Sequence, residues 1–341
     1  MKTTDFAKHL TSFLGHYLPA ECGMSQNTIT TYSYTFTLLI QYYTNVENIV
    51  PEHLTLETLT YERIIGFLDW LEKDRKCSIA TRNARLGCLH SFFNYLQYNN
   101  VQGLVQWQRL HSIKNKRVAV PEMAYLDTTG TKLLLEQPDL HTRKGRRDFA
   151  LMGLMYDSAC RVQEIIDLTP SRLRFDTTTT LAINGKGNKT RIVPLNSSQV
   201  HNLKQYMNEN DLLDPINAHC PLFPNPQGGK LSRMAVLNII KKYAQMARKK
   251  HPELIPDHLG CHSLRHSKAM HMLEADINLV WIRDFLGHSC TTTTEIYARA
   301  SSKMKEDALA KLDPGILKKE KSSWQRNKEL LSYLKSLQTK Y

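Results

Sequence analysis

The chain has 341 residues, of which 41% are hydrophobic and 23% charged, a length and composition that suit two globular domains. It carries 45 lysines and arginines against 32 aspartates and glutamates, a formal net charge of +13 that favours an acidic partner such as nucleic acid. Charge alone does not separate a DNA-binding protein from other basic proteins. The sequence has no run of about 18 apolar residues and starts with a polar segment, so we expect a cytoplasmic protein with no membrane span.

The cysteines and histidines do not predict a metal centre or a disulfide framework. Seven cysteines are scattered without paired spacing, as is typical of free thiols in a reducing compartment. His258, Cys261, His262 and His266 lie close together in the sequence, but no second pair of ligands accompanies them. We therefore expect no metal and no other cofactor.

Residues 1–115 are predicted to form a helical domain. Apolar residues recur at helical spacing over residues 26–43, 60–73 and 78–98, and Ser78 is expected to cap the third of these helices. The side chains that this third helix is expected to bury are Ile79, Leu86, Leu89, Phe93 and Leu96.

Two arginines of that third helix, Arg82 and Arg85, fall largely off its apolar stripe. They are candidates for contact with a DNA backbone, and the alternative is an ordinary solvated helix face. Residues 116–121 combine the end of a run of basic residues, Lys116 and Arg117, with Pro121, which predicts an exposed linker.

Residues 122–312 show mixed signals, so the whole chain is predicted to be mainly α with a small β-sheet. Helices are expected around residues 131–135 and 146–158. Alternating residues predict strands at 180–183 and 190–195, joined by a glycine-containing turn that projects Lys186. Lys189 and Arg191 follow that turn and are further candidates for DNA contact.

A set of basic residues ends in one tyrosine, and its members in chain order are Arg161, Lys186, His262, Arg265, His288 and Tyr297. Arginine presents a planar fork of donors that matches phosphate oxygens two at a time. Preorganised cations can neutralise the charge that develops on a phosphoryl group under attack, and a nearby base or cation activates a phenol. Taken alone, a histidine is more often a packed structural residue than a catalyst, a lysine is more often solvated, and a tyrosine more often lies in the core. Together they indicate phosphodiester chemistry with Tyr297 as the nucleophile.

Four stretches of the sequence carry a family resemblance. They are residues 157–168, which contain Arg161 and Glu164; the glycine-rich turn and strand at 185–195; the His-Ser-Leu-Arg run at 262–265; and Leu-Gly-His at 286–288 with Tyr297 beyond it. Their order and spacing resemble the tyrosine recombinase, or phage integrase, family in its XerC/XerD-like form. The sequence departs from the family pattern at residues 158–160, where Ser-Ala-Cys stands in place of Thr-Gly and an apolar residue, and at Ala275, where glycine is frequent.

The resemblance implies a DNA recombinase that cuts and rejoins strands through a 3′-phosphotyrosyl intermediate, without metal or ATP. Lys186 would be the general acid, and His262 the base for Tyr297. Arg161, Arg265, His262 and His288 would stabilise the pentacoordinate phosphate. Glu164 would orient Arg161 through a salt bridge.

The resemblance also implies partners and domain roles. Residues 1–115 would be a SAM-like core-binding domain that clamps double-stranded DNA at specific sites, and residues 122–312 the catalytic domain. Four protomers, identical or together with related recombinases, would exchange strands. The amphipathic segment within 313–341 would dock as a helix on a neighbouring protomer, or fold back on its own domain.

The biological outcome stays open at this stage. Integration or excision of a mobile element is the first expectation, and resolution of chromosome or plasmid dimers and DNA inversion use the same chemistry. Two other classes remain, a type IB topoisomerase and a non-catalytic DNA-binding protein. A dependence on paired specific sites would argue against the first, and loss of function on substitution of Tyr297 against the second.

Overall fold

The computed structural model describes residues 3–118, 123–185 and 189–288, together with Thr294, Tyr297 and Ser332. The chain divides into two compact units, Met1–Pro121 and Glu122–Tyr341. Three predictions fall outside the described residues: Lys186 at the tip of the hairpin, the last residues of the linker, and the C-terminal helix apart from the single residue Ser332.

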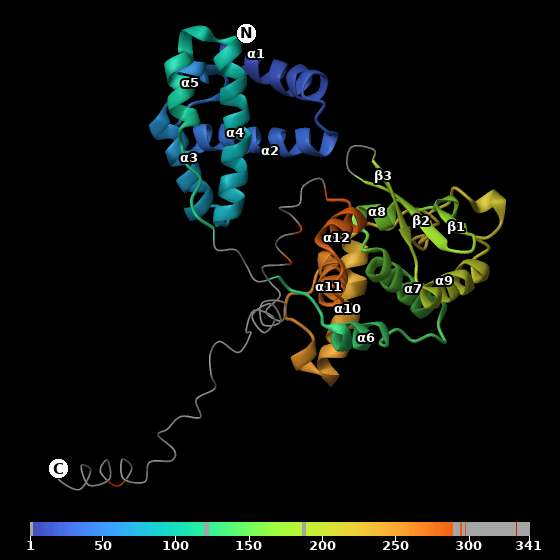
Figure 1. The fold of residues 1–341 in the computed structure, drawn as a ribbon. Helices are drawn as coiled ribbons and strands as arrows, with labels where there is room; N and C mark the ends of the chain where they lie inside the picture. Colours follow the sequence, from blue (N-terminus) through green and yellow to red (C-terminus); the bar gives the residue numbers. More distant parts are fainter. Residues whose placement is uncertain are drawn as a thin grey trace. The chain divides into compact units, whose positions relative to one another are not determined.

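The first unit is helical, as predicted (Figure 1). Its elements are α1 (Asp5–Ser12), a π-helix (Phe13–Glu21), α2 (Gln26–Asn45), α3 (Tyr61–Lys73), α4 (Ile79–Asn99) and α5 (Leu104–His111), with 3-10 turns at Pro51–His53, Leu56–Thr58 and Val101–Gly103. The hydroxyls of Ser25, Thr60 and Ser78 cap α2, α3 and α4 by accepting a hydrogen bond from a backbone N–H of the first turn. The three helices predicted in this region are therefore confirmed, with boundaries that differ by two residues or fewer at each end.

An aromatic cluster holds the first unit together. Phe13, Phe36 and Phe92 are each at most 1% exposed, and their ring centroids lie 5.0–6.1 Å apart with edge-on geometry. Aromatic pairs in this geometry add about 0.5–1.5 kcal/mol each beyond the burial of their area. The cluster joins the π-helix, α2 and α4.

The predicted buried stripe of α4 is wrong in two places. Ile79 is 38% exposed because it lies in the first turn of the helix, beyond the core. Arg82 is only 3% exposed: its Nη1 donates to the carbonyl of Lys114, and its Nε lies 3.7 Å from the Glu72 carboxylate. The chain after α5 returns over this face of α4, and a single-helix pattern does not reveal that cover.

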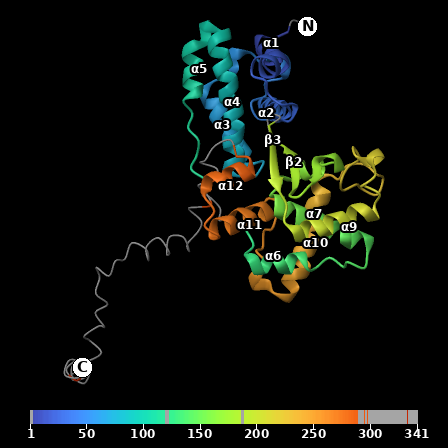
Figure 2. The ribbon, with the colours of Figure 1, turned by 45° about the vertical axis from the view of Figure 1, so that its right-hand side comes forward.

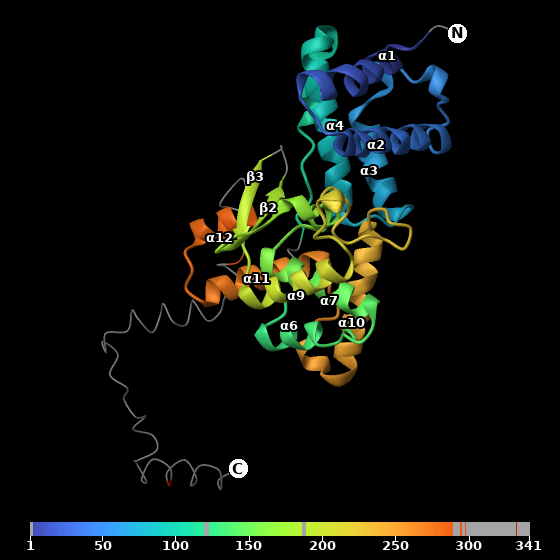
Figure 3. The same cartoon turned by 90° about the vertical axis from the view of Figure 1, so that its right-hand side faces the viewer.

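The second unit combines helices with a small sheet, as predicted (Figure 2). Its helices are α6 (Thr128–Leu135), α7 (Arg143–Ser158), α8 (Val162–Ile166), α9 (Ser197–Glu209), α10 (Arg233–Lys250), α11 (Cys261–Glu274) and α12 (Leu279–Leu286), with 3-10 turns at Pro170–Arg172, Pro215–Asn217 and Pro252–Leu254. Figure 3 shows the same unit from the side, with the sheet beside α7 and α9.

The sheet has the order β1-β2-β3 and is antiparallel, with β1 (Leu173–Phe175), β2 (Thr179–Asn184) and β3 (Thr190–Pro194). Ile183 of β2 pairs with Arg191 of β3, one pair before Asn184 and Thr190 close the described part of the hairpin. The predicted hairpin strands are confirmed. Strand β1 has only three residues and was not predicted.

Helix α7 is the central helix of the second unit, and it packs against α9 and α11. Its buried acidic residues are paired: Asp148 accepts hydrogen bonds from Arg147 and from the Tyr243 hydroxyl of α10, and Asp157 accepts them from Lys268 of α11 and from Asn196. These pairs satisfy charges that would be costly to bury alone. They join α7 to the helix that carries Arg265.

No helix among the described residues is long and apolar enough to cross a membrane.

Candidate active site

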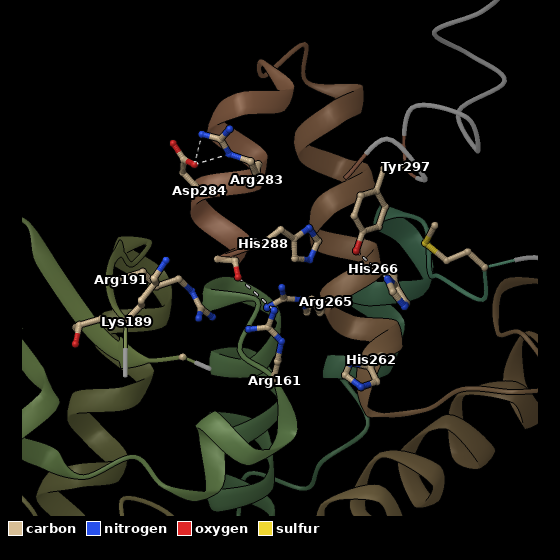
Figure 4. Close-up of a pocket in the computed structure, with 14 residues that line it drawn as sticks. Arg161, Lys189, Arg191, His262, Arg265, His266, Arg283, Asp284, His288 and Tyr297 are labelled. Atoms are coloured by element: carbon tan, nitrogen blue, oxygen red, sulfur yellow. Dashed lines mark hydrogen bonds and ion pairs between the residues drawn. The ribbon is translucent and has the colours of Figure 1, made fainter. Parts of the chain in front are cut away.

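A cavity of about 930 Å³ opens in the second unit where β3, the start of α8, α11 and the end of α12 meet (Figure 4). Among the described residues that line it, the cationic side chains are Arg161, Lys189, Arg191, Arg265 and Arg283. The one acidic residue among these described lining residues, Asp284, is paired with its neighbour Arg283 at 2.7 Å. A hollow with this excess of positive charge is suited to an anion.

The turn between α7 and α8 places Arg161. Helix α7 ends at Ser158, and Ala159 then adopts the left-handed conformation with φ 48° and ψ 34°. This is the position where the family pattern has glycine, and the left-handed conformation is less favourable for alanine by about 1–2 kcal/mol. Arg161 follows as the N-cap of α8.

Arg265 lies at the floor of the cavity and is 3% exposed. Its Nη1 donates to the carbonyl of Ala159 at 2.8 Å, and its Nη2 donates to the carbonyl of Leu286 at 2.7 Å. Both acceptors lie at helix C-termini, where the backbone dipole favours a cation. Burial, and then the charges of Arg161 and Arg191, lower the pKa of Arg265 to about 10, so it stays protonated at neutral pH.

Arg161 is held by three contacts and still faces the cavity. Its Nη1 donates to Glu164 Oε1 at 2.8 Å, its backbone N–H donates to Glu164 Oε2 at 2.8 Å, and its Nη2 donates to the carbonyl of Gly287 at 3.3 Å. About a third of its side chain, 34%, remains exposed. The salt bridge expected between Arg161 and Glu164 is therefore present.

His288 follows Gly287, the predicted C-cap of α12, which is left-handed with a φ of 65°. Its Nδ1 lies 3.0 Å from the hydroxyl of Thr294. Its ring is nearly parallel to the ring of Tyr297, with centroids 6.4 Å apart. Burial, and then the charges of Arg265 and Arg161, lower the pKa of His288 to about 4, so it is neutral at pH 7.

The Tyr297 hydroxyl meets His266 rather than His262. The Oη atom of Tyr297 lies 2.9 Å from Nδ1 of His266, and Tyr297 itself is 2% exposed. Burial raises the pKa of Tyr297, and the charges of Arg265 and Arg161 act in the opposite direction. Burial, and then the charges of His262 and Arg265, lower the pKa of His266 to about 4.

His262 lies at the rim of the same cavity and is exposed. Desolvation by the surrounding protein, and then the charges of Arg265 and Arg161, lower the pKa of His262 although its side chain still reaches solvent. Its ring centroid is 6.2 Å from that of His266, one helical turn along α11. The i, i+4 spacing of these two histidines is visible in the sequence, but the hydrogen bond of Tyr297 with the second of them was not predicted.

The residues expected to contact DNA have different surroundings. Lys189 is exposed and lines the cavity. Arg85 is half-buried, with its guanidinium 4.9 Å from the centre of the Tyr34 ring and 3.1 Å from the Thr35 hydroxyl. Arg82 is buried, and its Nη1 donates to the carbonyl of Lys114, so its guanidinium does not lie at the surface in this structure. Arg191 points inward and pairs with Glu164.

The described part of the chain contains no group of three or more histidine, cysteine, aspartate or glutamate side chains placed to hold a metal ion. The described lining of the cavity instead gathers guanidinium donors, three imidazoles whose pKa values are all lowered, and a phenol. Such a set can bind a phosphate diester, offset the charge that develops on it, and attack it with the phenol oxygen.

Comparisons with known proteins agree with this chemistry. The model of the phage integrase family matches residues 125–304, and the model of the phage integrase N-terminal SAM-like domain matches residues 10–100. A protein of Sinorhizobium fredii that carries the name integrase/recombinase y4rC is 33% identical over 98% of this chain and 99% of its own length. Tyrosine recombinase XerD of Oceanobacillus iheyensis is 28% identical over 88% of this chain and 96% of its own.

Two solved structures share the fold. The XerH site-specific recombinase bound to palindromic difH substrate superposes with a TM-score of 0.65 at 20% identity, over 84% of this chain and 80% of that one. The Tn1549 transposon integrase in complex with circular intermediate DNA gives a TM-score of 0.67 at 15% identity, over 89% of this chain and 98% of that one.

Proposed function

Because this chain belongs to the phage integrase family and is a tyrosine recombinase, we propose that Tyr297 attacks a phosphodiester at a specific double-stranded DNA site. The phenol oxygen forms a bond to phosphorus, the 5′ oxygen of the next nucleotide leaves, and a 3′-phosphotyrosyl link remains. The attack of a 5′ hydroxyl from a second strand reverses these bonds and releases Tyr297. Because the link conserves the energy of the broken bond, the reaction needs neither ATP nor a metal ion.

The observation that carries this proposal is the meeting of Arg161, Arg265 and His288 around a cavity that Tyr297 also lines. Arg265 is held rigidly by two carbonyls and Arg161 by Glu164, so both forks are oriented before DNA arrives. Preorganised donors of this kind stabilise the pentacoordinate phosphate at little reorganisation cost. His262, at the rim, contributes a further donor.

We assign two proton transfers. Lys186, which follows β2 and precedes β3 in the sequence, gives a proton to the leaving 5′ oxygen. His266 takes the proton of Tyr297, since its Nδ1 already lies 2.9 Å from the phenol oxygen and its ring is neutral. The entering phosphate brings negative charge that raises the pKa of this imidazole toward a useful value.

At the level of the cell, we propose integration or excision of a mobile element by a tetramer of this chain assembled on two DNA sites. The support is the name integrase/recombinase of the relative that aligns over almost the whole chain. In this assignment, residues 1–115 clamp the duplex, residues 116–121 link the two domains, residues 122–312 catalyse, and the segment 313–341 contacts a neighbouring protomer. The same protein would resolve dimers or invert DNA if its sites were arranged for those outcomes.

The test is covalent trapping without divalent metal. Purified protein is mixed with nicked duplexes drawn from the DNA that flanks its own gene, and the products are run under denaturing conditions beside Tyr297→Phe. We expect a shifted band with the wild-type protein that Tyr297→Phe lacks, while both bind the duplex equally. A band that persists in the variant would remove Tyr297 as the nucleophile, and strand joining that does not depend on paired sites would favour a type IB topoisomerase.

A further inference from the structure

Arg191 of β3 reaches from the hairpin into the floor of the active site. Its side chain is 11% exposed. Its Nη1 donates to Glu164 Oε1 at 3.0 Å and its Nη2 donates to Glu164 Oε2 at 2.8 Å, which is the bidentate geometry of a strong arginine–carboxylate pair. Arg191, a predicted DNA contact, therefore has both terminal nitrogens occupied by a carboxylate.

The carboxylate of Glu164 is shared between Arg191 and Arg161. Oε1 also accepts from Arg161 Nη1, and Oε2 also accepts from the Arg161 backbone N–H. Burial would raise the pKa of Glu164, but the hydrogen bonds from Arg191 and Arg161 outweigh that effect and lower it. Because Arg191 holds both oxygens, the carboxylate cannot rotate away from Arg161 without breaking two charged hydrogen bonds.

Arg191 also packs against the corner that carries His288. A β-carbon added at Gly287 would lie 3.0 Å from Arg191 Cδ and 3.2 Å from Arg191 Nη1. The carbonyl of the same Gly287 accepts the hydrogen bond from Arg161 Nη2. Arg191 thus contacts the end of α12 on one side and Glu164 of α8 on the other.

The buried position of Arg191 leaves one of its hydrogen-bond donors unsatisfied. Its Nε is buried and has no hydrogen-bond partner among the described atoms. A buried donor without a partner is unfavourable, because it has given up its hydrogen bonds to water. A surface arginine that only met DNA phosphates would have no need of such a position.

We propose that Arg191 is a positioning residue that orients Arg161 through Glu164 and supports the Gly287 corner before His288. It does so from the strand that leads out of the hairpin turn, so it couples that hairpin to the phosphate-binding arginines. This proposal rests on the function proposed above and goes beyond it, because Arg191 acts on the reaction without contacting the phosphate.

The decisive variant is Arg191→Lys, which keeps the charge and removes the bidentate geometry. Arg191→Met removes both, and Arg174→Met, an exposed arginine of β1, serves as the matched control. Single-turnover cleavage is measured at saturating protein on the nicked duplex identified by trapping. It is repeated on a duplex in which a methyl group replaces one non-bridging oxygen of the scissile phosphate.

We expect Arg191→Lys to cleave the ordinary phosphodiester about 100-fold more slowly, the size of effect that a small misplacement produces, with DNA affinity unchanged. On the methyl-substituted phosphate the loss should shrink, because that group carries less charge for Arg161 to hold. Arg161→Lys combined with Arg191→Lys should cost little more than Arg161→Lys alone, since both changes disable the same fork. Arg174→Met should match the wild-type protein on both duplexes.

Three results would overturn the proposal. An equal loss on both phosphates would mean a general structural role, loss of DNA affinity at a normal cleavage rate would mean a DNA contact, and a wild-type rate in Arg191→Lys would mean no role. A failure of the proposed function has a different signature, because it would remove cleavage by the wild-type protein itself or leave it intact in Tyr297→Phe.

Discussion

Glu164→Gln tests the charge network beneath the active site. The carboxylate is 7% exposed and accepts one backbone hydrogen bond and three from guanidinium groups. Glutamine keeps the shape of the side chain, but it removes the negative charge and turns an N–H₂ group toward at least one guanidinium. Arg161 and Arg191 would then face each other, and Arg265, with no carboxylate between them.

The expected loss of stability is about 3 kcal/mol, the lower end of the range for breaking a buried ion pair. We take the lower end because Arg161 is 34% exposed and water screens its half of the network, whereas Arg191 is 11% exposed. For a unit of this size each kcal/mol lowers the unfolding midpoint by about 2–4 °C. The midpoint of the second unit should therefore fall by about 6–12 °C.

Differential scanning calorimetry can resolve this shift, with the transition of the first unit as an internal reference. Glu136→Gln is the matched control, because Glu136 makes an exposed pair with Lys132 at 4.0 Å and its loss should cost less than about 1 kcal/mol. A fall of less than about 2 °C for Glu164→Gln, or a fall equal to that of Glu136→Gln, would show that the four hydrogen bonds do not stabilise the fold as argued.

Four further predictions concern two histidines, two glycines and a helix cap. Because the pKa values of His266 and His288 are lowered to about 4, these two histidines bind more protons in the unfolded chain than in the folded one between pH 4 and pH 6.5. The unfolding midpoint of the second unit should therefore fall as the pH drops from 6.5 toward 4. The fall should be less steep in a variant with glutamine at both positions. Gly287→Ala should cost about 1–2 kcal/mol and slow cleavage, because its φ is 65° and its β-carbon would press on Arg191. Gly87→Ala, where nothing lies within 4 Å of the added carbon, should instead stabilise α4 by about 0.5–1 kcal/mol in chemical denaturation. Ser78→Ala should cost about 1 kcal/mol in the first unit, measured by hydrogen exchange along α4.

Local signals in the sequence were enough to predict several elements of the fold. Helices α2, α3 and α4 combine apolar residues at helical spacing with a Ser or Thr cap, and both features act within one turn of the chain. The hairpin of β2 and β3 follows from alternation around a glycine-containing turn, and Gly287 from the need for a left-handed C-cap after α12. Strand β1 is too short for its three residues to show a period.

The sequence by itself determined the residue types of the site and their order along the chain, because a phosphate needs cations and a covalent link needs a nucleophile. Only the tertiary structure decided which of these residues meet. His266 joins Tyr297 across 31 residues, Arg191 joins Glu164 across 27, and Arg82 is covered by a segment 32 residues away. Such contacts depend on how separate elements pack, and each buried charge settles where that packing leaves it a partner.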